Sequence, residues 1–356
     1  MSKTIEPIKL MPFEGKIIMK AMMLRATTGP EALEQVQLPE PEPKPNEVLV
    51  RMRASSLNWR DSLIFKGGYR KQQKTENLIP LTDGAGEIVD VGADVDTWKV
   101  GDRVIANFCP NWIAGEPRRK DLESAAGKSV DGMLCELKTF APQALVRTPD
   151  HLTDIEAGSL PCAAQTAWNA LIVLGRIQPG DIVLTQGTGG VSLFALQFAK
   201  MAGAQVIITS SSDDKLARAK AMGADHLINY VANPDWGRAA VEISGGRGVD
   251  HVIELGGTQT LKQSLMAVRP GGTVSMIGVL SGANFGDLLL PFVVSRQVRL
   301  QGVTVGSRQM LETLCQALAV HSIKPVIDSV YKMEQTAEAL AHLNSGKHFG
   351  KVCIEI

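Results

Sequence analysis

The sequence predicts a two-domain α/β protein in which a β-rich domain precedes a doubly wound parallel sheet. Its 356 residues exceed the usual size of one domain. Between residues 20 and 143, apolar residues fall in short runs that are β-branched or alternate with polar residues, as is typical of strands. From about residue 180, strand-like runs alternate strictly with helical patterns. This alternation indicates a parallel sheet with helices on both faces.

The first domain is expected over residues 20–150 and follows an N-terminal extension, residues 1–19. Turns rich in Pro, Gly and Asp separate its strand-like runs, for example PEPEPKPNE before the second run. The expected strands are 21–25, 47–57, 86–92, 102–106 and 135–141. This pattern favours a β-rich barrel or sandwich.

The second domain is expected over residues 151–300 and has room for about six βα units. Its expected strands are 181–186, 204–210, 226–230, 248–257 and 271–279, and its expected helices are 191–203, 215–223 and 260–268. Residues 301–356 then hold two helical patterns and a closing strand, 351–356. That strand comes too late in the chain to extend the parallel sheet naturally, so it could return to the first domain.

The composition excludes several classes of protein. Acidic and basic residues number 37 each, and this balance lacks the basic surface of a nucleic-acid binder. Five cysteines without a CxxC pair argue against a disulfide framework and fit a reducing compartment. No apolar run approaches the ~18 residues of a membrane span, and the N-terminus is a poor signal peptide. We expect a cytoplasmic protein with a small-molecule substrate.

The most specific motif is the turn TQGTGGVS, which lies between a predicted strand and a predicted helix. Gly187 permits a tight turn, and Gly189 lets the backbone approach a pyrophosphate. The helix that begins with Gly190 and Val191 then offers unpaired N–H groups to the anion. Ser192 stands where a third glycine is usual and is small enough for close packing. The alternative is a glycine-rich turn without a ligand.

The end of the next strand indicates which dinucleotide binds. An NAD site usually places an acid there, but this strand ends in Ser210. Small hydroxyl residues leave room for a 2′-phosphate, and Lys215 could supply a positive charge. Asp213 and Asp214 complicate this interpretation unless they only cap the following helix. We therefore favour NADPH over NADH.

At this point the chain resembles the medium-chain dehydrogenase/reductase superfamily, and within it the zinc-free quinone oxidoreductase branch. The resemblance rests on ASSLNWRDSLIFKGGY, LTDGAGEIVDVG, GTGGVSLFALQFAKMAGAQVIITSSSDDKLARAKAMGADHLINY and HFGKVCIEI. It implies a GroES-like catalytic domain, a Rossmann domain, and a C-terminus that returns to the catalytic domain. It also implies a homodimer joined near LLPFVVSRQVRLQGV.

Zinc separates this sequence from the alcohol dehydrogenases of the superfamily. The positions that match their catalytic zinc ligands hold Asn58, Thr82, Asp83 and Cys162. One thiol and one carboxylate cannot form the usual site with three protein ligands. The segment that matches the structural zinc lobe has two cysteines, Cys109 and Cys135, instead of four. We expect no zinc of either kind.

Reduction of a simple carbonyl puts a full negative charge on one oxygen, which zinc normally stabilises. Without a metal, a favourable acceptor delocalises that charge itself. Quinones and α,β-unsaturated carbonyls do so, because hydride addition gives a phenolate or enolate that hydrogen-bond donors can stabilise. The sequence thus predicts an NADPH-dependent quinone or enone reductase. The alternatives are a zinc-type alcohol dehydrogenase with substituted ligands and a non-catalytic nucleotide-binding protein.

The resemblance assigns catalytic-site positions to Asn58, Asp61 and Tyr69 through the pattern N-x-x-D…G-x-Y. Asn58 and Tyr69 can donate hydrogen bonds, and Tyr69 could relay a proton. Asp61 is expected to orient a neighbour. Alternatively, Asn58 forms a turn, Asp61 caps a helix and Tyr69 is an ordinary loop aromatic.

Further cofactor contacts follow from the resemblance alone. It places Thr166 beside the nicotinamide, Lys215 and Tyr230 beside the adenosine phosphate, and Gly278 and Val305 near the carboxamide. Tyr230 could instead be a packing residue at a strand end. Either Lys347 or Lys351 could reach the phosphate. The six histidines show no ligand spacing and are interpreted as surface or packing residues: His151, His226, His251, His321, His342 and His348.

Overall fold

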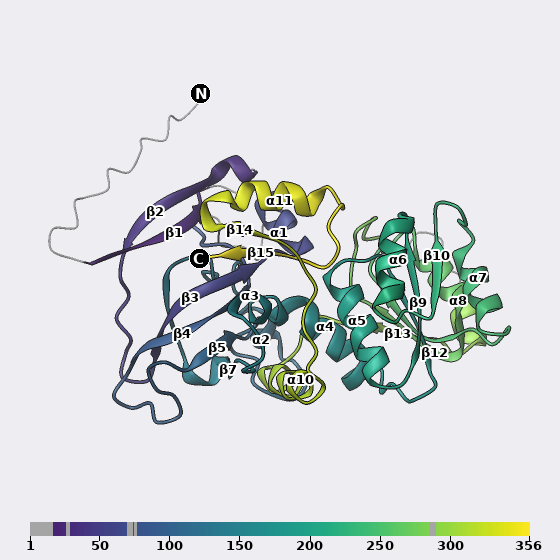
Figure 1. Ribbon diagram of the computed structural model, residues 1–356, viewed down its shortest axis with the longest axis horizontal. Coiled ribbons are helices and arrows are strands. Elements are labelled where there is room, and N and C mark those ends of the chain that lie inside the picture. The colour runs from purple at the N-terminus through teal and green to yellow at the C-terminus, as the bar shows by residue number, and fades with distance from the viewer. Residues whose placement is uncertain (1–16, 26–28, 70–73, 75–76, 285–289) are drawn as a thin grey trace.

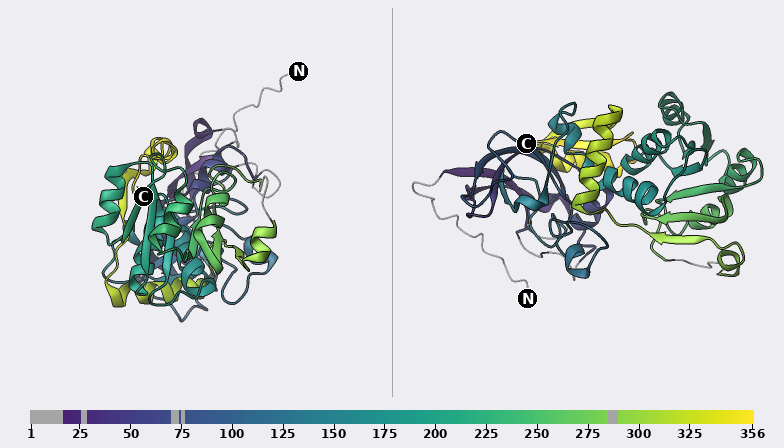
Figure 2. Two further views of the ribbon diagram at one scale, coloured as in Figure 1. Left: turned by 90° about the vertical axis from the view of Figure 1, so that its right-hand side faces the viewer. Right: turned by 90° about the horizontal axis from the view of Figure 1, so that it is seen from below.

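The computed structural model describes residues 17–25, 29–69, 74, 77–284 and 290–356. These residues form two lobes, which are clearly separated in Figure 1 and in the right-hand view of Figure 2. The first lobe holds the early strands and the C-terminus, and the second holds the parallel sheet. The predicted fold class, a GroES-like β-rich domain with a Rossmann domain, is confirmed.

The first lobe is built on a sheet whose strand order is β14-β15-β3-β4-β5-β7, with β6 paired to β3 on a side branch. A separate antiparallel pair, β1-β2, lies against it. The strands are β1 (Ile18–Leu24), β2 (Leu33–Pro39), β3 (Val48–Ser56), β4 (Asp83–Val91), β5 (Arg103–Ala106), β6 (Leu137–Phe140) and β7 (Leu145–Arg147). The helix α1 (Trp59–Phe65) follows β3 and buries Ile64 and Phe65 in this lobe's core.

The second lobe is a six-stranded parallel sheet in the order β10-β9-β8-β11-β12-β13, with helices on both faces (Figure 2). The strands are β8 (Ile182–Gln186), β9 (Gln205–Ser210), β10 (His226–Asn229), β11 (Val249–Glu254), β12 (Val268–Met276) and β13 (Arg299–Gly302). The helices are α5 (Gly190–Met201), α6 (Asp213–Ala221), α7 (Trp236–Ile243), α8 (Leu261–Ala267) and α9 (Leu290–Ser295). The strand order reverses between β8 and β11, and open α/β sheets bind ligands at the carboxyl ends of the strands at such a point.

Buried helical turns connect the lobes. They comprise α3 (Asp154–Ala157), η3 (Leu160–Ala164), α4 (Gln165–Trp168) and η4 (Asn169–Leu174), whereas the short helix α2 (Arg119–Leu122) lies within the first lobe. Short single turns, η1 (Pro30–Ala32) and η2 (Pro142–Ala144), lie between the early strands. Residues of the junction pack in one apolar core with α5, so the two lobes share buried surface.

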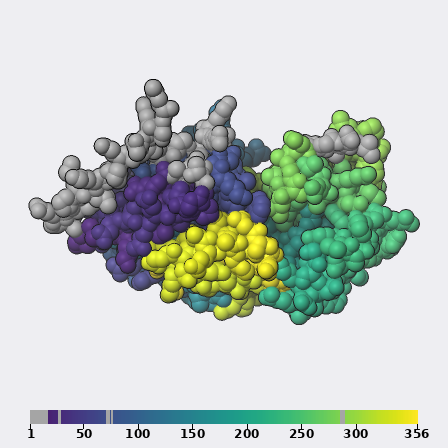
Figure 3. Space-filling model, turned by 90° about the horizontal axis from the view of Figure 1, so that it is seen from above, coloured from purple at the N-terminus to yellow at the C-terminus, as the bar shows by residue number. Residues whose placement is uncertain are grey.

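The C-terminal segment returns to the first lobe. It contains α10 (Arg308–His321), β14 (Ile327–Lys332), η5 (Met333–Gln335), α11 (Thr336–Asn344) and β15 (Lys351–Glu355). Strand β15 pairs antiparallel with β3, with Cys353 opposite Ser56. In Figure 3 this segment, in yellow, lies between the early strands and the second lobe. The longest of the described helices has 14 residues, and none is long and apolar enough to cross a bilayer.

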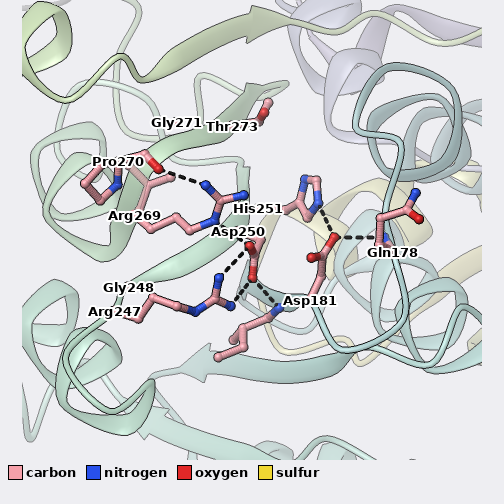
Figure 4. Close-up of polar contacts among 12 residues, drawn as sticks. Gln178, Asp181, Arg247, Gly248, Asp250, His251, Arg269, Pro270, Gly271 and Thr273 are labelled. Atoms are coloured by element: carbon pink, nitrogen blue, oxygen red, sulfur yellow. Dashed lines mark hydrogen bonds and ion pairs between the residues drawn. The ribbon is translucent and has the colours of Figure 1, made fainter.

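A buried carboxylate ties together the amino ends of the parallel strands (Figure 4). Asp250 is 2% exposed and accepts hydrogen bonds from Arg247, from Arg269 and from the backbone N–H of Ile182. Burial opposes ionisation of Asp250, but these donors outweigh it and hold its pKa below the ordinary value. Beside it, His251 contacts Asp181 at 3.1 Å. The network lies at the sheet edge opposite the ligand-binding edge, so its role is structural.

Candidate active site

A cleft of about 580 Å³ opens where the two lobes meet, at the carboxyl ends of β8, β9 and β11. Its wall in the second lobe is the glycine-rich turn with the start of α5. Its wall in the first lobe carries Asn58, Trp59 and Tyr69. All ten residues that the sequence analysis assigned to the cofactor line it: Thr166, Gly187, Gly189, Gly190, Val191, Ser210, Lys215, Tyr230, Gly278 and Val305.

The glycine-rich turn leaves space that no described protein atom fills. Gly187 has a φ of 73°, which favours glycine. Gly189 caps α5 with an ordinary extended backbone, and an added Cβ would meet only Nε2 of His348, at 3.7 Å. An added Cβ at Gly190 would instead meet Cδ of Lys351 at 2.7 Å. Glycine at 190 is therefore needed for packing, whereas glycine at 189 keeps a cradle at a helix N-terminus open for an anion.

Ser192 fills the place of the third glycine as expected. It is fully buried, and its hydroxyl donates to the backbone carbonyl of Gln186 at 2.6 Å. The side chain of Gln186 in turn donates to Glu254, and its Oε1 accepts the N–H groups of Leu255 and Gly256. These bonds hold the carboxyl ends of β8 and β11 together beneath the cleft.

The far end of the cleft carries Ser210, Lys215 and Tyr230 but no described carboxylate. The helix α6 begins at Asp213 with Ser212 as its cap, so the acids at 213 and 214 are not the cap themselves. Asp213 accepts a hydrogen bond from Asn229 at 2.8 Å and lies outside the cleft lining. The acids that complicated the cofactor assignment therefore do not line the cleft.

Lys215 holds the C-terminal loop against this end of the cleft. Its Nζ donates to the carbonyls of Gly346 and His348 at 2.6 and 3.0 Å. An ammonium group has three N–H donors, so one remains for a ligand. The backbone N–H of Gly350 also donates to the carbonyl of Thr188 in the glycine-rich turn, at 3.0 Å. The C-terminal loop is thus part of the cradle.

His348 corrects the interpretation of the histidines as surface or packing residues. It lines the cleft beside Gly189, and Nδ1 is buried without a partner among the described residues. Burial, followed by the nearby charge of Lys215, lowers its pKa to about 4. The imidazole is therefore neutral at pH 7 and can donate one N–H without adding charge.

Behind the cleft wall, a buried network joins the first lobe to the start of β15. Lys351 is 3% exposed, and its Nζ donates to Oδ1 of Asn58 at 2.6 Å and to the carbonyl of Leu57 at 2.8 Å. The ammonium lies 3.3 Å from Oδ2 of the fully buried Asp83. That oxygen also accepts from Ser56 at 2.6 Å and from Nδ2 of Asn58 at 2.8 Å. Lys351 therefore does not reach the phosphate, and the sequence interpretation that allowed it is wrong.

This network occupies the positions that match zinc ligands in alcohol dehydrogenases. A cation bound there would need the oxygens of Asn58 and Asp83, which the ammonium of Lys351 already contacts. Burial raises the pKa of the Cys162 thiol, which disfavours the thiolate that zinc requires. No cluster of three His, Cys, Asp or Glu side chains suited to a metal occurs among the described residues. The residues present do not fit zinc.

The three predicted catalytic residues fall in different places. Asn58 and Tyr69 line the cleft, but Asp61 lies behind it and is 1% exposed. Asn58, not Asp61, caps α1, and its backbone N–H donates to Oδ2 of Asp61 at 2.7 Å. Burial raises the pKa of Asp61 to about 6, although Arg60 opposes the shift. Asp61 thus holds the backbone of Asn58 within the capping box of α1, and its role at the catalytic site stays a prediction.

Two further positions assigned to the cofactor, Val305 and Gly278, are held by hydrogen bonds to their backbone atoms. Nδ2 of Asn169 donates to the carbonyl of Val305 at 2.7 Å, which fixes the segment after β13 at the cleft. The N–H of Gly278 donates to the carbonyl of Glu254 at 3.2 Å, and an added Cβ at Gly278 would meet the carbonyl of Leu255 at 2.2 Å. The hydroxyl of Tyr69 makes no hydrogen bond within the described part of the chain, so it is open to a ligand.

Comparison with known proteins agrees with this architecture. Residues 44–150 match the alcohol dehydrogenase GroES-like domain, and residues 190–320 match the zinc-binding dehydrogenase family. A zinc-type alcohol dehydrogenase-like protein of Schizosaccharomyces pombe is 40% identical over 91% of this chain and 94% of its own length. A chloroplast envelope quinone oxidoreductase homolog of Arabidopsis thaliana is 29% identical over 92% of this chain and 95% of its own.

Solved structures give the same result. The crystal structure of an NAD-dependent alcohol dehydrogenase superposes with a TM-score of 0.86 at 33% identity, covering 95% of this chain and all of the other. The two-lobed fold therefore has close counterparts among solved structures. The chain belongs to the medium-chain dehydrogenase/reductase superfamily and is an NAD(P)-dependent oxidoreductase.

Proposed function

We propose that this protein is an NADPH-dependent reductase of quinones or α,β-unsaturated carbonyls that works without zinc. The observation that carries the proposal is the position of Lys351, whose ammonium contacts both oxygen donors that a catalytic metal would need. A cleft of this kind lacks a Lewis acid for a localised alkoxide, so acceptors that delocalise the charge are favoured.

The nicotinamide coenzyme supplies a hydride when it is bound. The first-lobe wall supplies donors to the oxygen that becomes negative. The Asn58 amide has a second N–H beyond the one that it gives Asp83, and its orientation is fixed by Lys351 and Asp83. The phenol of Tyr69 is a second donor on the same wall. Two neutral donors suit an enolate or phenolate better than an alkoxide.

The preference for NADPH is supported by the far end of the cleft. Ser210, Ser211 and Lys215 face it, and Asp213 does not. A 2′-phosphate there gains hydroxyl donors and a partly used ammonium, whereas a ribose 2′-hydroxyl finds no carboxylate acceptor. NADH remains the alternative, and it is measured in the same assay.

Purified protein should contain less than stoichiometric zinc by elemental analysis and should oxidise NADPH with a panel of quinones and enones. Its rate should be the same after treatment with a chelator. Stoichiometric zinc, together with alcohol oxidation that the chelator abolishes, would instead show a zinc-type alcohol dehydrogenase. Tight NADPH binding with no turnover of any acceptor would show a non-catalytic nucleotide-binding protein.

Two further features complete the proposal. We place the enzyme in the cytoplasm, because its five cysteines are all free and burial raises the thiol pKa of Cys109, Cys135, Cys162, Cys315 and Cys353. We also propose a homodimer formed through β13, the edge strand of the parallel sheet, near the exposed Leu290 and Val294. Light scattering at micromolar concentration tests the dimer, and a monomer mass would refute it.

A further inference from the structure

The end of the cleft that holds Asn58 and Tyr69 also carries two cations, and the proposed reduction does not use them. Arg60 and Lys128 both line this end, together with the apolar side chains of Leu63, Phe108 and Leu122. No described carboxylate lines any part of the cleft. Positive charge beside an apolar wall, and away from the phosphate cradle, indicates a separate binding site for an anionic group of the ligand.

Arg60 is held in place but is only partly used. Its Nη1 donates to the hydroxyl of Thr82 and to the carbonyl of Ala126, and its guanidinium lies 4.6 Å from the centre of the Phe108 ring. Within the described part of the chain, no carboxylate pairs with Arg60 and no acceptor engages Nε or Nη2. A planar guanidinium with one edge fixed and the other edge open suits a carboxylate or sulfonate.

Lys128 lies on the same side of the cleft. Its Nζ is 5.5 Å from the centre of the Tyr69 ring, and Ala126, which Arg60 contacts, precedes it by two residues. Both cations line the cleft, and burial, followed by the charge of Arg60, lowers the pKa of Lys128. Two like charges held near each other favour an anion between them.

Three described acids in the segments around Arg60 and Lys128 have cationic partners of their own. Asp83 pairs with Lys351, Asp121 with Arg118 at 2.9 Å, and Glu123 with Arg119 at 2.7 Å. Asp61 is buried behind the cleft, and its raised pKa keeps much of it neutral at mildly acidic pH. None of these acids lines the cleft.

We infer that the physiological acceptor is an anion: a conjugated carbonyl compound with an apolar body and a carboxylate or sulfonate that Arg60 and Lys128 bind. This inference rests on the proposed function and deepens it, because it names the chemical class of the acceptor. The apolar body lies along Leu63, Phe108 and Leu122, and its conjugated carbonyl faces Asn58 and Tyr69.

The test compares benzalacetone that carries a para-carboxylate with its methyl ester, using NADPH as the reductant. The two acceptors share the same enone, and the carboxylate is remote from it. We expect kcat/KM to be at least about tenfold higher for the acid, because hydrogen bonds to a charged group add this much. Arg60→Gln and Lys128→Gln should each lower the acid-to-ester ratio at least about fivefold, and Arg60→Lys should restore part of it.

Lys66→Gln is the matched control, because Lys66 is an exposed cation just after α1 and should leave the ratio unchanged. A wild-type ratio of one or less, or variants with the wild-type ratio, would overturn the anion site while leaving the reductase function intact. If neither acceptor is reduced, the panel of quinones and other enones decides the proposed function separately. The anion site is then tested by thermal shift of the NADPH complex with the saturated analogue, which should stabilise wild type as the acid but not as the ester.

Discussion

The Nζ of Lys351 lies 2.6 Å from Oδ1 of Asn58, across 293 positions of the sequence. A lysine at the start of the last strand thus fixes an amide that lines the cleft. The same ammonium neutralises Asp83, and its stem packs against Gly190 in the cofactor turn. One side chain therefore connects the cradle, the catalytic wall and the final strand.

Lys351→Met should destabilise the protein by about 3 kcal/mol, because it leaves the buried carboxylate of Asp83 without a counter-charge. Chemical denaturation measures the loss. The double variant Lys351→Met, Asp83→Asn removes both charges and should recover at least half of it. Equal instability of the single and double variants would show that lost packing, and not charge, is the cause.

Gly189→Val should fold normally and lose cofactor binding. The extended backbone at Gly189 accepts a side chain, so the unfolding free energy should fall by no more than about 1 kcal/mol. The new side chain would occupy the cradle, and titration by intrinsic fluorescence should show at least about hundredfold weaker NADPH binding. Gly190→Ala is the contrast: it should destabilise the fold, because its Cβ meets Lys351. Unchanged NADPH affinity in Gly189→Val would remove the cradle assignment.

Lys215→Ala should raise KM for NADPH about tenfold and KM for NADH much less, because it removes a partner of the 2′-phosphate. The variant also releases the loop at Gly346 and His348, which affects both coenzymes equally. The ratio of the two KM values separates these effects. Lys220→Ala, on the same helix but outside the cleft, is the control. Equal changes for both coenzymes would argue against NADPH.

Asp61 predicts a pH dependence of stability. Its folded pKa of about 6 lies above the ordinary 3.8, so the folded state holds a proton that the unfolded state has lost. The stabilisation from this proton is fully present below pH 3.8 and is lost as the pH rises through 6. Asp61→Asn should remove up to about 3 kcal/mol of this decline. Denaturation curves at several pH values test it, and an identical decline in the variant would contradict the assignment.

Asp250→Asn should lower the unfolding free energy by about 3 kcal/mol, because Arg247 and Arg269 lose their shared buried partner (Figure 4). Activity per folded molecule should stay near that of wild type, because the network lies at the opposite edge of the sheet from the cleft. The depressed pKa of Asp250 means that its stabilisation is present above the ordinary carboxyl pKa and is lost as the pH falls. A large loss of kcat with unchanged stability would contradict a structural role.

Local patterns predicted most of the fold. The glycine-rich turn lies between β8 and α5 as expected, and α10 and α11 are the two helices expected within residues 301–356. Strand β2 was missed because LEQVQLP contains few β-branched residues, and β13 because an edge strand of four residues gives little pattern. The junction helices from 160 to 174 were missed because LPCAAQTAWNA is buried on all sides and shows no polar face.

The candidate site was predictable where a residue belongs to a motif and not where it depends on distant partners. Gly187 and Gly189 carry their own local signal. The inward turn of Lys351 does not, although a lysine at the head of the buried strand KVCIE was a hint. His348 was missed because its neighbour, the turn at Gly189, is remote in sequence. Arg60 and Lys128 meet only through tertiary structure.

The pairing of β15 with β3 constrains the order in which the chain can fold during synthesis. The parallel sheet closes with β13, so the inserted lobe has all of its strands once residue 302 has left the ribosome. The sheet of the first lobe must wait for residues 351–355, although β3 is made first. Until then the edge of β3 at residues 54–56 is an open template, and Asp83 is without its cation. In a nascent chain stalled before Gly350, this edge of β3 would stay open and Asp83 would lack the charge of Lys351.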